Sequence, residues 1–378
     1  MVSMFLTYGL YNFILIASTV FIYYSEKCRL SEDRRLLVFV AFVIVTLPAA
    51  VRYNIAYDYS SYVQIYNELG SSGNVEGFWV FFISVLNNFK LSSDSFFIFS
   101  SILIYGVFYF SLPKKYGYII NFIYILFFYF QSYSLIRSFL VTSYIFIICF
   151  SYMREPKIIS HLVVLLVMSI FVHKSAIVFL ALFLISIFIP INFWLRLRWI
   201  SLILAVLLFI YRYEFIEFIT NLPLLSWIGY DGYMLDPHFL TKVELGTGIG
   251  FLCKLLILFS PLFITQSLLL NNQKYSFCVV LLLFGVVSLI LSVSYQIFDR
   301  LYLLSLIAYP IAVYLILLSS SKTWIVLPFL LFGVIFFELS ITKQLSSECE
   351  SLRISPYVSI FNKDADRSLP ISMCQDLN

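Results

Sequence analysis

Residues 4–24 read MFLTYGLYNFILIASTVFIYY, a run of 21 positions without a charged side chain. An α-helix needs about 20 such residues to cross the hydrocarbon core of a bilayer. Similar runs recur along the 378-residue chain, which is 62% hydrophobic, 20% aromatic and only 12% charged. Soluble domains carry about twice that share of charged residues. The composition therefore predicts a membrane protein and excludes a soluble globular enzyme.

Long apolar stretches alternate with short polar breaks, which predicts an all-α, polytopic integral membrane protein with about twelve transmembrane helices. We expect these helices near residues 4–24, 36–51, 96–112, 118–134, 138–152, 158–172, 175–190, 199–211, 248–270, 276–294, 301–318 and 323–340. A further apolar stretch, 77–89, is too short to cross and is expected to lie in the interface or to re-enter.

The expected domain organisation is one transmembrane domain over 1–340, followed by a polar outer tail over 341–378. Two long segments, 52–95 and 212–247, are expected on the outer face. Cys349 and Cys374 lie in the tail, and whether they pair is left open.

The orientation is predicted from the basic residues of the short breaks. One set of alternate breaks holds 12 of the 24 Lys and Arg residues but only four acidic residues. The positive-inside rule makes this side cytoplasmic, so both termini are expected outside. The formal net charge of +4 is spread along the chain, so no nucleic-acid partner is expected.

Five basic residues lie at the outer ends of predicted spans, where the positive-inside rule disfavours them. Each could anchor its helix at the membrane surface by snorkelling. Together they indicate a site for a diphosphate, because guanidinium groups bind phosphate oxygens in a bidentate manner. Asp299 either orients its neighbour Arg300 or forms a local ion pair with it. The five residues are Arg52, Arg137, Lys174, Arg212 and Arg300.

Three titratable residues on the outer side are candidates for proton transfer. Asp58 could act as a general base or hold one of the arginines. Glu76 precedes the stretch 77–89, where it is either catalytic or a simple helix N-terminal carboxylate. His173 lies in a tight outer turn and could move a proton near neutral pH, or be an ordinary turn histidine.

The tyrosines that follow Asp58 are candidates for binding sugar. Tyr59, Tyr62 and Tyr66 are spaced i, i+3 and i+7, which places them on one helical face. Such a face either stacks on sugar rings, assigned here to Tyr59 and Tyr62, or belongs to the aromatic belt of the membrane surface. Acidic residues do not cluster as in a metal site, and Asp364-Ala365-Asp366 is attributed to chance. No metal and no cofactor are expected.

The ordered set of these positions resembles the EpsG/Wzy family of bacterial polysaccharide polymerases. Departures from the family pattern are Ala56-Tyr57 where Gly-Thr is common, Glu76-Gly77 for Glu-Pro, and Arg137-Ser138 for Arg-Gln. The positions that carry the resemblance are Arg52 to Tyr59 with Tyr62, Glu76, Ile136-Arg137-Ser138, His173-Lys174-Ser175, Asp299-Arg300-Leu301-Tyr302, and Pro356 to Phe361.

The resemblance implies a fold like that of C-type glycosyltransferase-like membrane polymerases and a metal-independent glycosyltransferase activity. A growing glycan on polyprenyl diphosphate would be transferred to the non-reducing end of a polyprenyl-diphosphate-linked repeat unit. This would occur on the outer face of the bacterial cytoplasmic membrane, for O-antigen, capsule or exopolysaccharide. The implied partners are the lipid-linked donor and acceptor, the bilayer, and a chain-length regulator protein.

Two alternatives remain open at this point. Another polyprenyl-phosphate-dependent glycosyltransferase would use acids in the first outer segment, a role that Asp58 and Glu76 could fill. A lipid-linked oligosaccharide flippase would place charges along the interior of its spans. The charges of this chain gather at the ends of the predicted spans, with Lys254 as the main exception. This distribution favours the polymerase.

Overall fold

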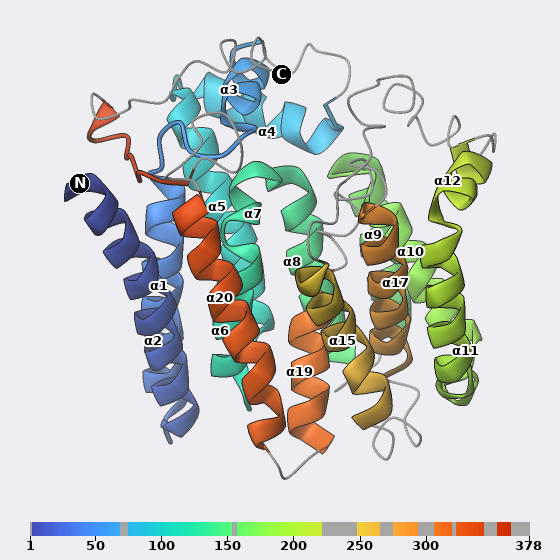
Figure 1. Ribbon diagram of the computed structural model, residues 1–378. Coiled ribbons are helices and arrows are strands. Elements are labelled where there is room, and N and C mark those ends of the chain that lie inside the picture. The colour runs from blue at the N-terminus through green and yellow to red at the C-terminus, as the bar shows by residue number, and fades with distance from the viewer. Residues whose placement is uncertain are drawn as a thin grey trace. The chain divides into compact units, whose positions relative to one another are not determined.

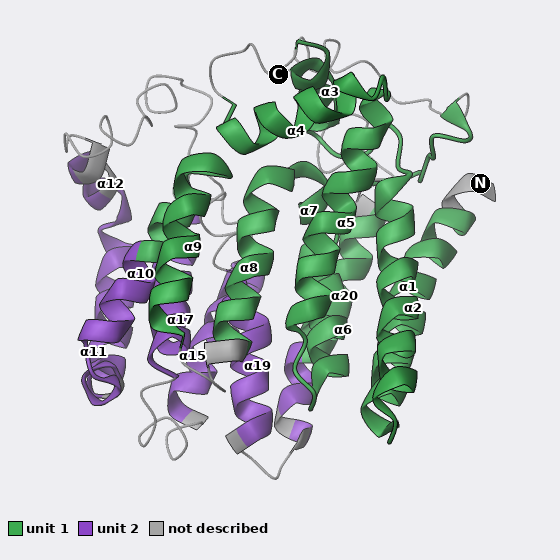
Figure 2. Cartoon of the chain, turned by 180° about the vertical axis from the view of Figure 1, so that it is seen from behind, with its two compact units in different colours: residues 1–180, 330–378 green, residues 181–329 purple. Residues whose placement is uncertain are grey.

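The computed structural model describes residues 2–68, 75–152, 157–220, 248–264, 275–293, 306–319, 323–343 and 354–363. Within these ranges every regular element is a helix, and the β pairing found is an isolated antiparallel bridge between Arg52 and Ser359. The all-α prediction is confirmed for the described residues. The chain forms two compact units, residues 1–180 with 330–378, and residues 181–329 (Figure 2).

Unit 1 is a bundle of apolar helices that run side by side (Figure 1). Helices α1, α2, α5, α6 and α8 pack against one another, and α9 packs against α8. Two short helices, α3 and α4, lie across one end of this bundle, where α2 ends and α5 begins. The bounds are α1 Val2–Lys27, α2 Ser31–Ala50, α3 Tyr59–Asn67, α4 Gly77–Asn88, α5 Ser93–Ser111, α6 Gly117–Phe128, α7 Gln131–Ser134, α8 Ile136–Tyr152 and α9 Ile158–Phe171.

The core of unit 1 is built from aromatic rings. Phe108 of α5 and Tyr124 of α6 stack with ring centroids 3.6 Å apart, and both side chains are fully buried. Helix α20 (Leu327–Lys343) returns to this core at Gly333, where an added Cβ would lie 2.8 Å from Leu126 of α6. A larger residue at this position would require the Leu126 side chain to shift.

Unit 2 is built around α17 (Ser276–Ser292), most of whose residues are buried. Helices α11, α15 and α19 pack against it. Helix α10 (Ala176–Phe188) contributes Phe183, which packs edge-on against Phe277. The remaining bounds are α11 Ile191–Ile210, α12 Arg212–Thr220, α15 Ile249–Ile264, α19 Ala308–Ser319 and the 3₁₀ helix η2 Thr323–Val326.

The predicted spans can be compared with these helices. Each of the stretches named above overlaps a described helix, and 77–89 corresponds to the short helix α4. By length and composition, two described helices suffice to cross a membrane, Phe5–Lys27 and Ser93–Ser111, and nine shorter ones are apolar. The helical, apolar character of a membrane protein is thus present, and the number of crossings stays a prediction.

Within unit 1, a segment of the predicted tail, residues 354–363, packs against the loop after α2. The backbone N–H of Tyr53 donates to Val358 O at 2.9 Å, and that of Ile360 donates to Val51 O at 2.8 Å. The Tyr357 hydroxyl donates to Pro48 O at 2.8 Å. Burial raises the pKa of Tyr357 to about 12, so this hydroxyl keeps its proton at neutral pH. The segment therefore holds the loop that follows α2. Cys349, Cys374, Asp364 and Asp366 lie outside the described residues.

Candidate functional site

Glu76, Arg137 and His173 meet at the end of unit 1 that α3 and α4 cover, and we refer to them as the polar cluster. Arg137 Nη1 lies 2.6 Å from Glu76 Oε2, a charge-assisted hydrogen bond. His173 Nε2 lies 3.9 Å from Glu76 Oε1. Glu76 immediately precedes α4, Arg137 lies in the first turn of α8, and His173 lies in the turn after α9. The tertiary structure thus brings together three residues that the sequence singled out separately.

The polar cluster is partly open to solvent. The Arg137 and His173 side chains are each 25% exposed, and the Glu76 side chain is 10% exposed. Among the described residues, Arg137 Nε is buried and has no hydrogen-bond partner. The exposed part of the Arg137 guanidinium, beside a partly buried carboxylate, is suited to bind a further anion.

The sequence left two interpretations of Glu76 open, as a catalytic residue or as a carboxylate that only stabilises the N-terminus of a helix. Glu76 does occupy the N-cap position of α4, with extended backbone, but its side chain makes no capping hydrogen bond. The carboxylate is directed to Arg137 and His173 instead. The geometry therefore favours a role in the polar cluster over simple capping.

The orientation of the His173 ring follows from its neighbour Ser175. The backbone N–H of Ser175 donates to His173 Nδ1 at 3.2 Å, and the Ser175 hydroxyl lies 2.7 Å from the same atom. Because Nδ1 accepts a hydrogen bond, the ring hydrogen of the neutral form is on Nε2, the atom that faces Glu76.

Trp79 positions the polar cluster, although its sequence pattern did not single it out. Its side chain is 1% exposed, and its Nε1–H donates to Val172 O at 2.9 Å. This bond joins α4 to the end of α9, next to His173. Gly77 packs against Phe171 at the same junction. In a sequence, a Trp inside a short apolar helix is typical of the membrane interface. Its hydrogen bond to Val172 O could therefore be identified only from the tertiary structure.

Arg52 lies deep in unit 1 rather than at an open surface. Its side chain is 1% exposed, and its guanidinium donates to Ala49 O, to Ser101 Oγ and to Tyr133 O. The guanidinium also lies over the ring faces of Phe97 and Tyr133, 5.0 and 4.7 Å from the centroids. These contacts argue against the expected diphosphate contact and favour a structural role, because both Nη atoms donate to protein groups and Nε, which has no partner among the described residues, is buried away from any ligand.

Tyr59 and Tyr62 are also buried, which argues against the expected stacking on sugar rings. Tyr59 stacks on Phe97 with centroids 4.3 Å apart, and Tyr62 stacks on Phe96 at 5.6 Å. Tyr66 shares the buried face of α3. The helical face expected from the i, i+3, i+7 spacing is therefore present, but it packs against α5 of the same chain.

Tyr62 also borders the polar cluster. Burial raises the pKa of its hydroxyl, and the Arg137 guanidinium opposes this rise through charge and hydrogen bonding. Arg137 is in turn stabilised in its charged form by Tyr62 and by Glu76. Asp58, at the N-terminal end of α3, lies close enough to act electrostatically on Tyr62.

The loop between Arg52 and Asp58 contains a turn in which Ala56 has φ of +89°. This backbone region favours glycine. Ala56 is also part of one departure from the family pattern, because the family commonly has Gly-Thr where this chain has Ala56-Tyr57. Ala56 is 2% exposed, so the turn is held by its packing.

We expect Ala56→Gly to stabilise the protein. Glycine removes the Cβ clash of the left-handed conformation, which costs roughly 1 kcal/mol for a non-glycine residue. The midpoint of thermal unfolding in detergent should rise by a few degrees, and activity should be retained. A lower midpoint would show that the Ala56 methyl group contributes more through packing than it costs in strain.

The remaining candidates are placed as follows. Lys174 is exposed and adjoins His173 in the chain. Arg212 begins α12 in unit 2, where its guanidinium donates to Phe209 O at 2.7 Å and to the Tyr213 hydroxyl at 3.2 Å. Asp299 and Arg300 lie outside the described residues.

The described part of the chain contains no candidate metal site. There, no group of three or more His, Cys, Asp or Glu side chains is placed to hold a metal ion. The polar cluster itself pairs its one carboxylate with a guanidinium. Metal independence stays a prediction, and it is tested below.

A model of the EpsG family matches residues 35–359. The chain belongs to the EpsG family. The match covers every residue of the polar cluster and ends at Ser359, the residue whose backbone pairs with Arg52. EpsG-family membership makes the chain a membrane protein of polysaccharide biosynthesis with a glycosyltransferase-like, polymerase-like function. Searches of curated proteins and of solved structures returned no match.

Proposed function

We propose that this EpsG-family protein extends a glycan held on polyprenyl diphosphate by transferring it to the non-reducing end of a lipid-linked repeat unit. The polar cluster carries the proposal, because it combines a cation for the leaving diphosphate with a carboxylate for the acceptor hydroxyl. We place the cluster on the outer face of the bacterial cytoplasmic membrane, as the distribution of basic residues indicates. A chain-length regulator remains a proposed partner.

The chemistry divides between the members of the polar cluster. The acceptor hydroxyl oxygen attacks the anomeric carbon of the donor sugar, and the bond from that carbon to the diphosphate oxygen breaks. The electron pair leaves with the diphosphate, where negative charge develops. The Arg137 guanidinium stabilises this charge, and the exposed Lys174 beside the cluster adds a second cation.

The proton of the acceptor hydroxyl goes to a base, and we assign this role to Glu76. His173 is less suited to it because Nδ1 already accepts the Ser175 N–H and Nε2 bears the ring hydrogen. His173 Nε2–H instead orients the Glu76 carboxylate or donates to the diphosphate. Asp58 remains a second candidate base, at the start of α3.

The isoprenoid chain of the substrate requires an apolar groove. Unit 2 contains a cavity of about 550 Å³ lined by α11, α12 and α17, whose walls are almost entirely apolar. Leu204, Leu208 and Val287 are among its lining residues. By its lining alone, this cavity is suited to a hydrocarbon chain.

The test uses full-length protein in proteoliposomes supplied with a polyprenyl-diphosphate-linked repeat unit. We expect a ladder of glycan lengths, one polyprenyl diphosphate released for each bond formed, and unchanged activity in excess EDTA. Glu76→Gln should give no ladder, since the amide cannot accept the proton. Loss of activity in EDTA with recovery in Mg²⁺ would contradict metal independence.

The same assay separates the alternatives. Glycan growth that requires a sugar on lipid monophosphate would favour another glycosyltransferase. Movement of the lipid-linked unit between leaflets, without bond formation, would identify a flippase and refute the polymerase.

A further inference from the structure

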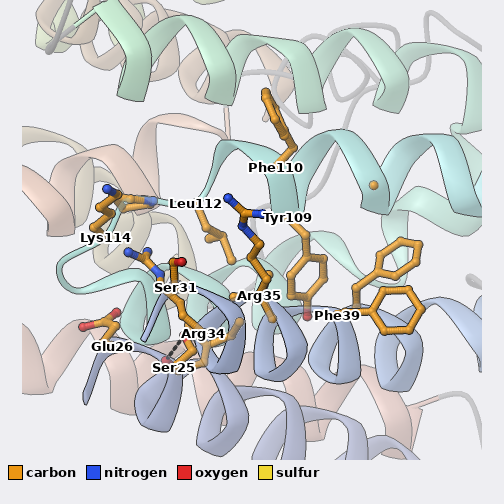
Figure 3. A pocket seen from close by; sticks show the side chains of 15 residues that line it. Ser25, Glu26, Ser31, Arg34, Arg35, Phe39, Tyr109, Phe110, Leu112 and Lys114 are labelled. Atoms are coloured by element: carbon orange, nitrogen blue, oxygen red, sulfur yellow. Dashed lines mark hydrogen bonds between the residues drawn. The ribbon is translucent and has the colours of Figure 1, made fainter. Parts of the chain in front are cut away.

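A second polar site lies at the other end of the unit 1 helices from the polar cluster. A cavity of about 680 Å³ opens where α1 ends and α2 begins. Its walls are the last turns of α1, the first half of α2, the second half of α5, and residues 112–114 (Figure 3). All of these segments belong to unit 1.

Three basic side chains line this cavity, and Figure 3 shows Arg34, Arg35 and Lys114 gathered toward one side of it. Within the described part of the chain, none of the three forms an ion pair. Arg35 and Lys114 are exposed, and Arg34 is half-buried. A cavity with three cations and no paired acid favours an anionic ligand.

The one acidic residue that lines the cavity, Glu26, is engaged elsewhere. Its carboxylate accepts the backbone N–H groups of Tyr116 and Tyr118, at 3.1 and 3.0 Å. These bonds place it at the N-terminus of α6, where a helix favours a negative charge. Arg34 lies close enough to act on this carboxylate electrostatically. Arg35 and Lys114 therefore remain uncompensated.

The acids that precede Arg34 on the same helix do not change this balance. Glu32 and Asp33 lie in the first turn of α2, are exposed, and do not line the cavity. In the described part of the chain, neither acid forms an ion pair with Arg34, Arg35 or Lys114.

The other side of the cavity is apolar and aromatic. It is lined by Val38, Phe39, Phe42 and Phe110. Phe39 is 60% and Phe110 is 84% exposed, so this wall is open on its outer side. In a membrane-embedded bundle such an exposed aromatic wall faces hydrocarbon.

We propose that this cavity, formed by Arg34, Arg35 and Lys114 beside Phe39 and Phe110, binds an anionic glycerophospholipid. The guanidinium groups bind the phosphodiester oxygens, and Lys114 adds a point charge. The aromatic wall packs against an acyl chain. Basic pockets between membrane helices bind anionic headgroups in this manner. The site is independent of the function proposed for the polar cluster.

Native mass spectrometry of full-length protein in detergent tests the site. Dioleoyl phosphatidylglycerol and dioleoyl phosphatidylcholine are added in separate titrations. We expect at least one tightly bound phosphatidylglycerol and no comparable binding of phosphatidylcholine. Neutralising the cavity with Arg34→Gln, Arg35→Gln and Lys114→Gln should weaken phosphatidylglycerol binding at least about tenfold.

The matched control removes three positive charges from the same end of unit 1 without touching the cavity walls. It should weaken binding less than about threefold, because only diffuse attraction is lost. The control variant carries Lys27→Gln, Arg29→Gln and Lys115→Gln.

Equal losses in the two triple variants, or equal binding of the two lipids, would overturn the proposal. Arg35→Lys covers the case in which the cavity triple variant fails to fold. This exposed change keeps the charge but loses the planar fork, so binding should fall between wild type and Arg35→Gln. Wild-type affinity in both single variants would also refute the site.

Discussion

Arg137→Ala is expected to abolish long polymer while the protein still inserts and folds. Cells that carry it should accumulate lipid-linked glycan with a single repeat unit. The reason is that the guanidinium, held at 2.6 Å by Glu76, supplies preorganised positive charge where the diphosphate leaves. Loss of one such donor costs about 10²–10³ in rate. Arg137→Lys keeps the charge without the planar fork, so it should give short chains only.

Removal of Arg137 also leaves Glu76 without its partner, and this loss of stability has to be separated from the loss of catalysis. The double variant Arg137→Gln/Glu76→Gln separates these effects, since a neutral amide pair can preserve the hydrogen bond. We expect it to match wild type in thermal unfolding and to remain inactive. Full-length polymer from this double variant would reduce the pair to a structural role. Arg196→Ala, an exposed residue of α11, is the control that should retain activity.

Truncation after Arg353 should be as damaging as loss of Arg137. It removes the segment 354–363, whose backbone pairs with Val51 and Tyr53 and whose Tyr357 bonds to Pro48 O. Ile354 and Val358, both buried, are lost as well. The loop that leads to Asp58 and α3 then loses its support. We expect no detectable polymer and a clearly lower midpoint of thermal unfolding.

Truncation after Lys363 is the matched control. It keeps every contact of the segment, including the Lys363 ion pair with Asp94 at 2.9 Å, and removes Asp364 to Asn378. Activity should be retained, which would also exclude a catalytic role for the Asp364-Ala365-Asp366 motif. Tyr357→Phe, which removes only the bond to Pro48 O, should cost ~1 kcal/mol of stability. Full activity after truncation at Arg353 would show that the segment has no part in the site.

Much of the helical architecture could be predicted from local sequence. The run 4–24 falls within α1, and the short stretch 77–89 is the short helix α4. This succeeds because an α-helix satisfies its backbone hydrogen bonds internally, so length and hydropathy suffice to locate it. The face formed by Tyr59, Tyr62 and Tyr66 was equally predictable from spacing.

What packs against each face could not be predicted in this way. An arginine at the end of an apolar run looks the same in sequence whether it binds a ligand, snorkels or is buried. Arg52 and Arg137 both follow this pattern, yet Arg52 is 1% exposed among carbonyls and aromatic rings, while Arg137 pairs with Glu76. Their difference depends on neighbours about 50 to 80 residues away, such as Tyr133 and Glu76.

The sequence by itself thus determined the helical, apolar character of this protein. It also indicated which titratable residues are candidates for a functional site, because both features depend on local composition and spacing. Only the tertiary structure decided that Glu76, Arg137 and His173 form one cluster. It also decided that residues 354–363 pack against the loop after α2. The physical reason is that these contacts join segments distant in the chain, through hydrogen bonds such as that from Trp79 to Val172 O, which no local pattern encodes.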